Sequence, residues 1–314
     1  MYWHFQASFQ AFEIDEYVVE KHNTDWFLIY NSLFNNNETL NKVNEELKYV
    51  TPKMFNRNIQ LYVPLRFFFT KQSQSAFPIA ALYRSDVNIR LQTNNITDVF
   101  MGNKIISSVT FNKAVLSVNY IHLDKKEQKY FANNTHEYLI EQTQILSEIN
   151  ITSTTKTKKI PLDFAHPIKS FYWVIVNDIN NSQNMKTGNN WLSYTSSDSL
   201  YSDTFNTAKI TINGQDRLID LDASYFRNVV PYEIQSYFPR KYIYSYSFSL
   251  YPGQYQPSGS CNYSRIQNNN SFLELSFNNV NTYGGSTNGR VKTYGINYNI
   301  LKISEGQGGL LFMN

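Results

Sequence analysis

Large apolar side chains alternate with small polar ones in this 314-residue chain, and the alternation strongly restricts its fold. In Tyr242–Leu250, aromatic or aliphatic residues fill the even positions and Ser fills most of the odd positions. Successive side chains of a β-strand point to opposite faces, so this pattern predicts a strand with one buried face. Ala114–Tyr120 repeats the alternation more weakly and indicates another strand.

Other segments also have the composition of strands. Phe171–Val176 is apolar at every position, which is typical of a strand covered on both faces. Asn213-Gly214 lies between two strand-like runs in Ile210–Ile219, and Asn-Gly in that position predicts a hairpin. Further strands are expected at Gln60–Phe68, Val87–Leu91, Phe272–Phe277 and Tyr294–Ile303.

Helical signals are few. Asp124–Glu127 has the form of a capping box, which predicts a short helix that runs toward Phe131. Thr135–Glu137 has the composition of a second helix start, and Leu40–Tyr49 is a third candidate. Many short strands with few, short helices are typical of an all-β sandwich or jelly roll.

Composition excludes several classes of protein. Aromatic residues make up 16% of the chain, charged residues 17%, and the net charge is +3, which excludes an intrinsically disordered chain. The 28 basic and 25 acidic residues nearly cancel, so we expect no direct binding to nucleic acid through charge. Asn occurs 38 times, and because Asn favours turns we expect long polar loops between the strands.

The cysteine count and the hydropathy pattern indicate the cellular compartment in which the protein is made. Cys261 is the single cysteine, which excludes an intrachain disulfide and a Cys-based zinc site and fits a reducing compartment. No apolar run reaches the roughly 18–20 residues of a membrane helix. Met1–Gln6 lacks the profile of a signal peptide, so we expect a soluble product made in the cytosol.

A search for catalytic chemistry finds no convincing site. The five histidines lie far apart in sequence, without an H-E-x-x-H pair, and neither a Walker A loop nor a G-x-S-x-G turn is present. His136 precedes Glu137, but a packing or capping histidine is the simpler interpretation. Cys261 has no basic neighbour before Arg265, which favours an inert thiol. We therefore predict no catalytic, cofactor-binding or metal-binding residue.

Four blocks of the sequence, in their order and spacing, match the pattern of one family. The first block is Val63–Phe69 with Phe77–Leu82 and Ser85–Val87, and the second is Val118–Asp124 with His136–Gln142. The third block is Asn213–Arg217 with Tyr225-Phe226 and Pro231-Tyr232, and the fourth is Tyr244–Pro252 with Gln256–Arg265. Together they resemble the major capsid proteins of nucleocytoplasmic large DNA viruses, a group that includes irido-, phycodna- and mimivirus-like viruses. The last block is the most specific single match.

The resemblance implies an all-β fold with a tandem (double) jelly-roll β-sandwich, an incomplete first barrel and few short helices. Residues 1–103 would form the C-terminal part of the first jelly roll, and residues 104–314 the second. The strand at Phe12–Glu16 and the helix at Trp26–Leu33 resemble elements from the middle of the first barrel. Family members usually have Gly-Gly where this chain has Asp15-Glu16.

The residues that match the family pattern would be structural. They are Pro64, Leu65, Phe67, Pro78, His136, Glu137, Tyr138, Gln256, Pro257, Ser258, Gly259, Asn262 and Ser264. In the Gln256–Arg265 segment we expect Pro257 and Gly259 to fix the backbone geometry and the Ser and Asn side chains to satisfy amides.

The function implied by the resemblance is that of a structural major capsid protein without a cofactor. Homotrimers would form pseudo-hexagonal capsomers that tile an icosahedral shell, in contact with neighbouring capsomers and with minor capsid and penton proteins. The protein would be found in the virion capsid and be assembled in the host cytoplasm. The long polar segment Asn177–Thr207 would form an exposed loop of the second barrel.

Two other classes and a variant of the first remain open on the sequence. Exposed aromatic residues in a jelly roll rich in Asn and Tyr are compatible with a carbohydrate-binding β-sandwich module. A jelly-roll enzyme is disfavoured by the scattered histidines. The chain could also be a minor capsid paralogue that does not assemble.

Overall fold

The computed structural model describes residues 7–34, 65–93, 113–178, 194–195, 203–235, 241–266, 270–277 and 288–313. The chain divides into two compact units. Unit 1 comprises Met1–Thr24, Tyr49–Gln142 and Asn299–Asn314, and unit 2 comprises Asp25–Lys48 and Thr143–Tyr298.

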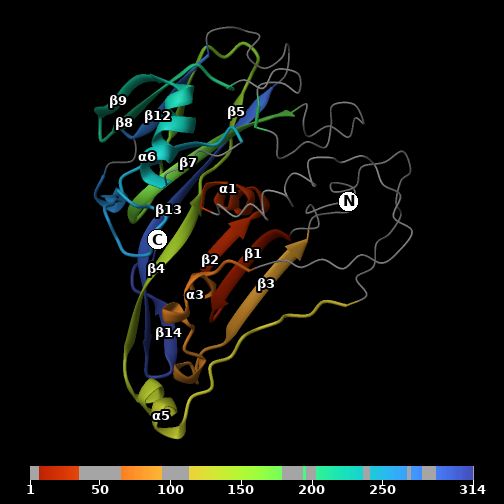
Figure 1. The fold of residues 1–314 in the computed structure, drawn as a ribbon, viewed down its shortest axis with the longest axis vertical. Helices are drawn as coiled ribbons and strands as arrows, with labels where there is room; N and C mark the ends of the chain where they lie inside the picture. Colours follow the sequence, from red (N-terminus) through yellow and green to blue (C-terminus); the bar gives the residue numbers. More distant parts are fainter. Residues whose placement is uncertain are drawn as a thin grey trace. The chain divides into compact units, whose positions relative to one another are not determined.

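Unit 1 contains an antiparallel three-stranded sheet in the order β2-β1-β3 (Figure 1). Its strands are β1 (Ala7–Ile14), β2 (Tyr17–Asn23), β3 (Val87–Thr93) and β14 (Gln307–Leu310), and its helices are α3 (Phe68–Lys71), η2 (Ser73–Ser75), η3 (Ile79–Ala81) and α5 (Lys125–Asn133). Its core forms between Phe12 and Ile14 of β1, the α3 region and the ends of two long strands, where Ile140 and Leu301 are buried.

Unit 2 is built from two sheets and short helices (Figure 1). Its elements are α1 (Thr24–Phe34), β5 (Ile149–Ile151), β6 (Thr157–Pro161), β7 (Pro167–Asn177), β8 (Thr207–Ile212), β9 (Gln215–Asp222), η5 (Tyr225–Val229), α6 (Val230–Gln235), β10 (Tyr244–Ser247), β11 (Cys261–Asn262), η6 (Tyr263–Arg265) and β12 (Phe272–Ser276). One sheet has the order β6-β12-β8-β9, and in the other β10, β7 and β13 are neighbours. The long strands β4 (His136–Ile145) and β13 (Gly289–Ser304) pair with each other and have residues in both units.

Strand β7 explains why one stretch of the sequence is apolar at every position. Phe171, Trp173 and Ile175 enter the core formed with β8 and β12. Tyr172 and Val174, on the opposite face, pack in a second cluster with the apolar face of α1. Since β7 is covered on both faces, the interpretation of Phe171–Val176 is confirmed.

Several locally specified elements match their predictions. Asn213 and Gly214 form the β8–β9 turn with φ angles of 52° and 77°, as a two-residue hairpin with left-handed central residues requires. The Asp124 side chain accepts from the backbone amides of Lys126 and Glu127 and completes the capping box of α5. The predicted strands at Val87–Leu91, Phe272–Phe277 and Tyr294–Ile303 are β3, β12 and β13.

Two predictions of secondary structure are wrong, and a third is wrong at its described end. Ala114–Tyr120 is not part of a sheet among the described residues. At Thr135–Glu137 the chain enters strand β4, which begins at His136, rather than a helix, because pairing with β13 and burial of Ile140 override the local capping signal. The described end of Gln60–Phe68 enters helix α3, where Phe67, Phe68 and Phe69 surround Phe12 with ring centroids 5.8, 6.1 and 5.0 Å away. A strand would point Phe68 away from its two neighbours.

Three further expectations fall on other parts of the chain. The helix at Leu40–Tyr49, most of the Asn177–Thr207 loop and the domain boundary at residue 103 lie outside the described residues. The division into residues 1–103 and 104–314 therefore stays a prediction. Tyr194, from within the expected exposed loop, is 1% exposed and packs in the cluster that contains Trp26, so the loop is not exposed at this residue.

The β1–β2 turn is strained at Asp15 and Glu16. Asp15 and Glu16 have φ angles of 48° and 69°, which are unfavourable for residues with a Cβ. Asp15 offsets its strain because its carboxylate accepts hydrogen bonds from the Ser85 hydroxyl at 2.6 Å and the Asp86 amide at 2.8 Å. The exposed Glu16 side chain has no such bond among the described residues.

We therefore expect Glu16→Gly to raise the free energy of unfolding by about 0.5–1 kcal/mol, as relief of left-handed strain exceeds the entropic cost of glycine. Asp15→Gly is the control, since it relieves the same strain but removes two hydrogen bonds and should give no gain. Urea unfolding of both variants checks this, and a Glu16→Gly protein no more stable than the wild type would contradict the strain argument.

Candidate functional site

A buried carboxylate from β2 organises the segment of the first sequence block. Glu20 is 2% exposed, and its Oε2 accepts a 2.8 Å hydrogen bond from the backbone N–H of Phe68, the first residue of α3. The Nε2 of His22 lies 2.8 Å from Oε1 of the same carboxylate. Phe67, which precedes α3, makes no capping hydrogen bond through its side chain. A residue 48 positions away thus satisfies a free amide at the start of the helix.

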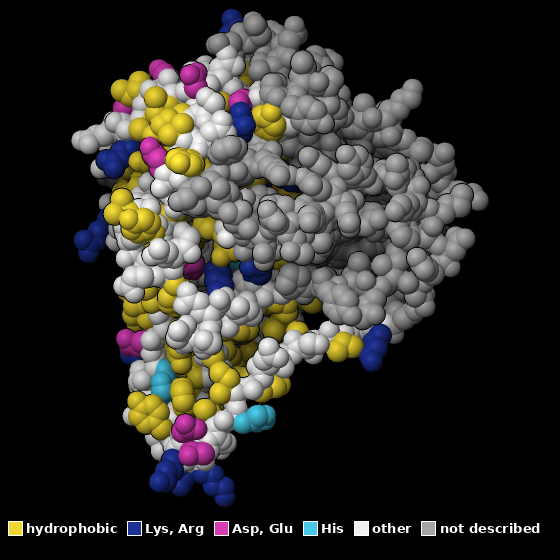
Figure 2. All heavy atoms as spheres, viewed as in Figure 1, with side chains coloured by type: hydrophobic (Ala, Val, Ile, Leu, Met, Phe, Trp, Pro, Cys, Tyr) yellow, Lys and Arg dark blue, Asp and Glu magenta, His cyan; other side chains and the backbone are white. Residues whose placement is uncertain are grey.

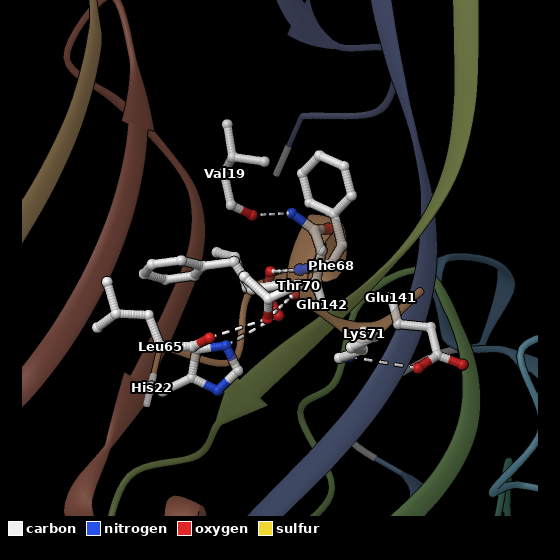
Figure 3. A network of polar contacts seen from close by, with 10 residues as sticks. Val19, His22, Leu65, Phe68, Thr70, Lys71, Glu141 and Gln142 are labelled. Carbon is white, nitrogen blue, oxygen red and sulfur yellow. Dashed lines mark hydrogen bonds and ion pairs between the residues drawn. The ribbon is translucent and has the colours of Figure 1, made fainter. Parts of the chain in front are cut away.

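Further polar contacts hold α3 in place (Figure 3). The Thr70 hydroxyl donates to the carbonyl oxygens of Leu65 at 2.8 Å and Phe67 at 2.9 Å. The Lys71 ammonium lies 3.5 Å from the Glu141 carboxylate of β4. The first and second sequence blocks therefore meet inside unit 1.

The Gln142 side chain joins three parts of unit 1. Its Nε2 donates to the carbonyl oxygen of Val19 in β2 (Figure 3). Its Oε1 accepts from Nδ2 of the buried Asn299 at 2.9 Å. Asn299 Nδ2 also donates to the carbonyl oxygen of Phe312 at 2.8 Å. This chain of amides connects β2, β4, β13 and the C-terminal residues.

His136 has a packing and hydrogen-bonding role. Its ring stacks on Phe131 with centroids 4.9 Å apart, and its Nε2 lies 2.9 Å from the Phe131 carbonyl oxygen. Glu137 is exposed and lies 3.4 Å from the Lys302 ammonium. Tyr138 packs against the core of unit 1, and burial raises the pKa of its hydroxyl. His136 therefore makes packing and hydrogen-bonding contacts within unit 1.

Ser258 anchors the turn in the fourth sequence block. Its hydroxyl lies 2.6 Å from the Ser249 hydroxyl and accepts from the Tyr251 amide at 2.9 Å. Its carbonyl oxygen accepts from the Leu250 amide at 3.3 Å. The chain that leaves β10 is thereby tied to the chain that returns toward β11.

Asn262 and Ser264 fasten the end of the same block to the start of β7. Oδ1 of Asn262 accepts from the Ser264 amide at 3.1 Å and caps the short helix η6. The Ser264 hydroxyl accepts from the His166 amide at 2.9 Å, and the Tyr263 amide donates to the His166 carbonyl at 3.0 Å. His166 has a φ of 63°, so these bonds hold a backbone conformation that is unfavourable by itself.

Two ionic networks lie in unit 2, and both are fully paired. Arg227 binds both carboxylate oxygens of Asp203, at 2.7 and 3.0 Å, and the Tyr244 hydroxyl donates to Asp203 at 3.0 Å. Burial, followed by the charge of Asp203, holds the pKa of Tyr244 well above its usual value. Asp203 thus holds Arg227 and Tyr244 together through three hydrogen bonds.

The second network surrounds Lys292. Its ammonium contacts Asp25 and lies 3.3 Å from Glu148, which also pairs with Arg290 at 3.0 Å. Burial alone would lower the pKa of Lys292, but the two carboxylates outweigh it and the pKa is raised. Lys292 therefore remains charged and is no candidate for a general base.

The single thiol is also unsuited to catalysis, and the described acidic and histidine side chains are unsuited to metal binding. Burial raises the pKa of the half-buried Cys261 thiol, although the charge of Arg217 opposes this, so little thiolate forms. Among the described residues, no three His, Cys, Asp or Glu side chains are grouped to hold a metal ion. No described helix is long and apolar enough to span a membrane.

Exposed apolar side chains are concentrated in unit 1. Of the 21 large apolar residues that are exposed in the described part of the chain, 15 belong to unit 1, although fewer residues of this unit are described. Figure 2 shows apolar side chains of the described residues in yellow on one face. Five of the 15 are Val115, Leu116, Val118, Tyr120 and Ile121. Exposed apolar residues that form a contiguous patch would mark a site of association.

Comparison with known proteins identifies the family. A family model described as large eukaryotic DNA virus major capsid protein matches residues 127–309, and one described as major capsid protein N-terminus matches residues 5–124. The chain belongs to this major capsid protein family. The major capsid protein of Pyramimonas orientalis virus is 30% identical over 96% of this chain and 75% of the relative. That of Paramecium bursaria Chlorella virus 1 is 31% identical over 96% and 78%.

Solved structures extend the match to the fold of this capsid protein. VP54 of PBCV-1, as fitted into a reconstruction of the virophage Sputnik, has a TM-score of 0.79 and 30% identity and covers 99% of this chain and 84% of VP54. The Faustovirus major capsid protein, at 12% identity, has a TM-score of 0.70 and shares the fold. The double jelly-roll fold expected from the sequence is confirmed.

Family membership favours the structural class over the enzyme and the carbohydrate-binding module that the sequence left open. Major capsid proteins are structural components of the virion, and the prediction of a structural, non-enzymatic protein is confirmed. A capsid protein associates with copies of itself and with its neighbours in the shell. The functional site is therefore a set of contact surfaces rather than a cleft.

Most of the predicted motif residues make the hydrogen bonds described above or are at least half-buried. Phe67 and Pro78 are buried, Leu65 and Tyr138 are half-buried, and Pro64 lies outside the described residues. Gln256, Pro257, Gly259, Asn262 and Ser264 are exposed, and Ser258 is half-buried. Sequence reasoning missed Glu20 and Asp203, because their hydrogen-bond partners are distant in sequence.

Proposed function

We propose that this capsid protein forms homotrimeric, pseudo-hexagonal capsomers that tile an icosahedral shell. In this shell the capsomers contact one another and minor capsid and penton proteins, and assembly takes place in the host cytoplasm. The observation that carries the proposal is the likeness to the quasi-atomic model of the PBCV-1 virus capsid, with a TM-score of 0.78 and 28% identity over 99% of this chain.

The surface composition supports such an assembly. Obligate interfaces are larger and more apolar than transient ones, with buried areas of roughly 2,000–5,000 Å². The exposed apolar residues of unit 1 provide surface of that kind, whereas a net charge of +3 gives little repulsion between copies. Unit 2, with its two sheets packed on a common core, provides the rigidity that a shell component needs.

We also propose that the residues of the family motif stabilise the protomer rather than contact a ligand. The amide contacts of Ser258, Asn262 and Ser264 support this role in unit 2. The buried positions of Phe67 and Pro78 support it in unit 1.

Native mass spectrometry of the purified chain, followed by electron microscopy, tests the assembly. We expect a particle of about three times the 36.7 kDa chain mass with a three-fold outline. A strictly monomeric protein would instead indicate a paralogue that does not assemble. Saturable binding on a glycan array by such a monomer would favour the carbohydrate-binding module.

A further inference from the structure

One ion pair of unit 2 lies beside a second carboxylate, and its groups come from distant segments. The Nζ of Lys292 in β13 lies 2.5 Å from Oδ2 of Asp25, which is in the first turn of α1. The same nitrogen lies 3.3 Å from Oε1 of Glu148. The side chains of Lys292 and Asp25 are 16% and 17% exposed. An amine and two carboxylates thus lie together with little access to solvent.

Glu148 is positioned by strand pairing and by a neighbouring cation. It directly precedes β5, which pairs with Arg290 and Val291 of β13, so it comes alongside Lys292. Arg290 lies two residues before Lys292, on the same face of β13, and binds Oε2 of Glu148 at 3.0 Å. The other oxygen, Oε1, therefore faces the Lys292 amine.

A buried hydroxyl contacts the second oxygen of the Asp25 carboxylate. Tyr194 is 1% exposed, and its hydroxyl donates to Oδ1 of Asp25 at 3.4 Å. Burial, followed by the charge of Asp25, holds the pKa of Tyr194 well above its usual value, so the hydroxyl keeps its proton. A neutral donor at Oδ1 would stabilise negative charge that develops on this oxygen.

The cluster has the parts that acyl transfer between side chains needs. Lys292 has a nucleophilic nitrogen, and Glu148 is a proton acceptor within reach of it. Asp25 has the carboxyl carbon that the nitrogen would attack. An ordinary ion pair of unit 2 lacks these parts: Lys209 lies 2.8 Å from Asp216, but among the described residues it makes no ion pair with a second carboxylate.

We propose that Lys292 and Asp25 of the folded chain join in an amide bond, with Glu148 as the proton acceptor. Lys292 starts as an ammonium, so Glu148 first takes a proton from Nζ and passes it to Oδ2 of Asp25. Nζ then attacks Cγ of Asp25, a C–N bond forms, and the bond from Cγ to Oδ2 breaks. A second proton from Nζ follows the same path, and Oδ2 leaves as water. One ammonium and one carboxylate thus become one amide and one water, no other reactant is consumed, and Glu148 ends as it began.

The surroundings favour the amide over the ion pair. Groups that are held in contact react as if at effective concentrations of roughly 10⁵–10⁸ M. Amide formation also removes two charges from a site where their loss of hydration is costly. Glu148 is 41% exposed, which gives the released water a path to solvent.

The bond would close a covalent loop from residue 25 to residue 292 and hold α1 against β13. With its single cysteine the chain cannot form an intrachain disulfide, and an amide also persists in a reducing compartment. The bond lies within one protomer, so the inference goes beyond the proposed assembly and does not depend on it.

The mass of the full chain after denaturation tests the bond directly. We expect protein that has been kept folded at neutral pH to be lighter than its sequence mass by one water. Protease digestion should then give one branched peptide that joins the segments of Asp25 and Lys292. Lys209 and Asp216 are the internal control and should be unlinked in the same digest. A chain at its unmodified mass, or a loss of water that maps to other residues, would overturn the inference.

Matched variants test the proton acceptor. We expect Glu148→Gln to form the branched peptide at least about a hundredfold more slowly than the wild type. Glu274→Gln removes the partner of the exposed Lys159 at 3.7 Å and should form it at the wild-type rate. Lys292→Arg keeps a positive charge, but its guanidinium stays protonated, so the chain should keep its full mass. A wild-type rate in Glu148→Gln, or the same loss of water in Lys292→Arg, would contradict the assignment.

The outcomes also separate this inference from the proposed function. A wild-type chain that forms trimers but has its unmodified mass would refute the amide bond and leave the capsomer intact. A monomer that carries the branched peptide would refute the capsomer and leave the bond intact.

Discussion

Gly259→Ala is expected to lower the free energy of unfolding by about 3 kcal/mol or more, because two penalties act at one position. Gly259 has a φ of 139°, a region that is nearly restricted to glycine. A Cβ at this position would lie 2.5 Å from the carbonyl oxygen of Phe248. That oxygen cannot withdraw easily, since the Phe248 amide is bonded to the Lys169 carbonyl at 2.9 Å and the next turn is tied to Ser258.

Two other glycines separate these penalties. Gly214 has a φ of 77° but nothing within 4 Å of an added Cβ, so Gly214→Ala should cost only the backbone strain of about 1–2 kcal/mol. Gly309 has neither a left-handed φ nor a neighbour within 4 Å, so Gly309→Ala should stay within about 0.5 kcal/mol of the wild type. Urea unfolding of the three variants measures the order of their losses in the free energy of unfolding. If Gly259→Ala is no worse than Gly214→Ala, the contact with Phe248 is not rigid.

The elements that could be predicted from the sequence are those whose cause is local. The Asn213-Gly214 turn and the Asp124 cap depend on residues within a few positions, and both are present. The apolar run of β7 was also sufficient to predict a strand covered on both faces, because such a strand needs no polar position. In such cases local preference and tertiary packing favour the same structure.

The wrong predictions have their causes elsewhere in the chain. Thr135–Glu137 has the composition of a helix start, yet its neighbours pair with β13, more than 150 residues later. The three consecutive phenylalanines after Arg66 are compatible with a strand, but the position of Phe12 between them favours a helical turn. Alternation in Ala114–Tyr120 is typical of a strand, but it contains no information on a partner strand, and the segment is in no described sheet.

The residues of the candidate site also divide into those that could be predicted from the sequence and those that could not. The resemblance predicts the motif residues, and the contacts of Ser258, Asn262 and Ser264 are of the kind that Ser and Asn side chains make with backbone amides. Glu20 could not be found, because its role depends on the amide of Phe68 in a distant segment. The one signal for a distant cap was the absence of a local one, because α3 begins after Phe67, whose side chain has no group that could cap a helix.

Glu20→Ala should then lower the free energy of unfolding by about 3–4 kcal/mol. The substitution leaves the Phe68 amide and the His22 ring without their buried acceptor, and each lost bond of this type costs about 1–3 kcal/mol. Glu20→Gln retains an oxygen for the Phe68 amide and should lose less than half as much. Hydrogen exchange at the Phe68 amide, measured by NMR, reports the cap directly and should accelerate in Glu20→Ala more than in Glu20→Gln.

Glu137→Ala is the matched control, since Glu137 is also a strand glutamate with a basic partner, Lys302, at 3.4 Å. Its side chain is 53% exposed, whereas that of Glu20 is 1% exposed. Exposed ion pairs contribute little, so Glu137→Ala should change stability by less than about 0.5 kcal/mol. Equal losses in the two alanine variants would mean that burial of Glu20 adds nothing to its bonds. A large difference would show that the first family block is held by an acceptor on β2, and that the phenylalanines around Phe12 cannot hold α3 without it.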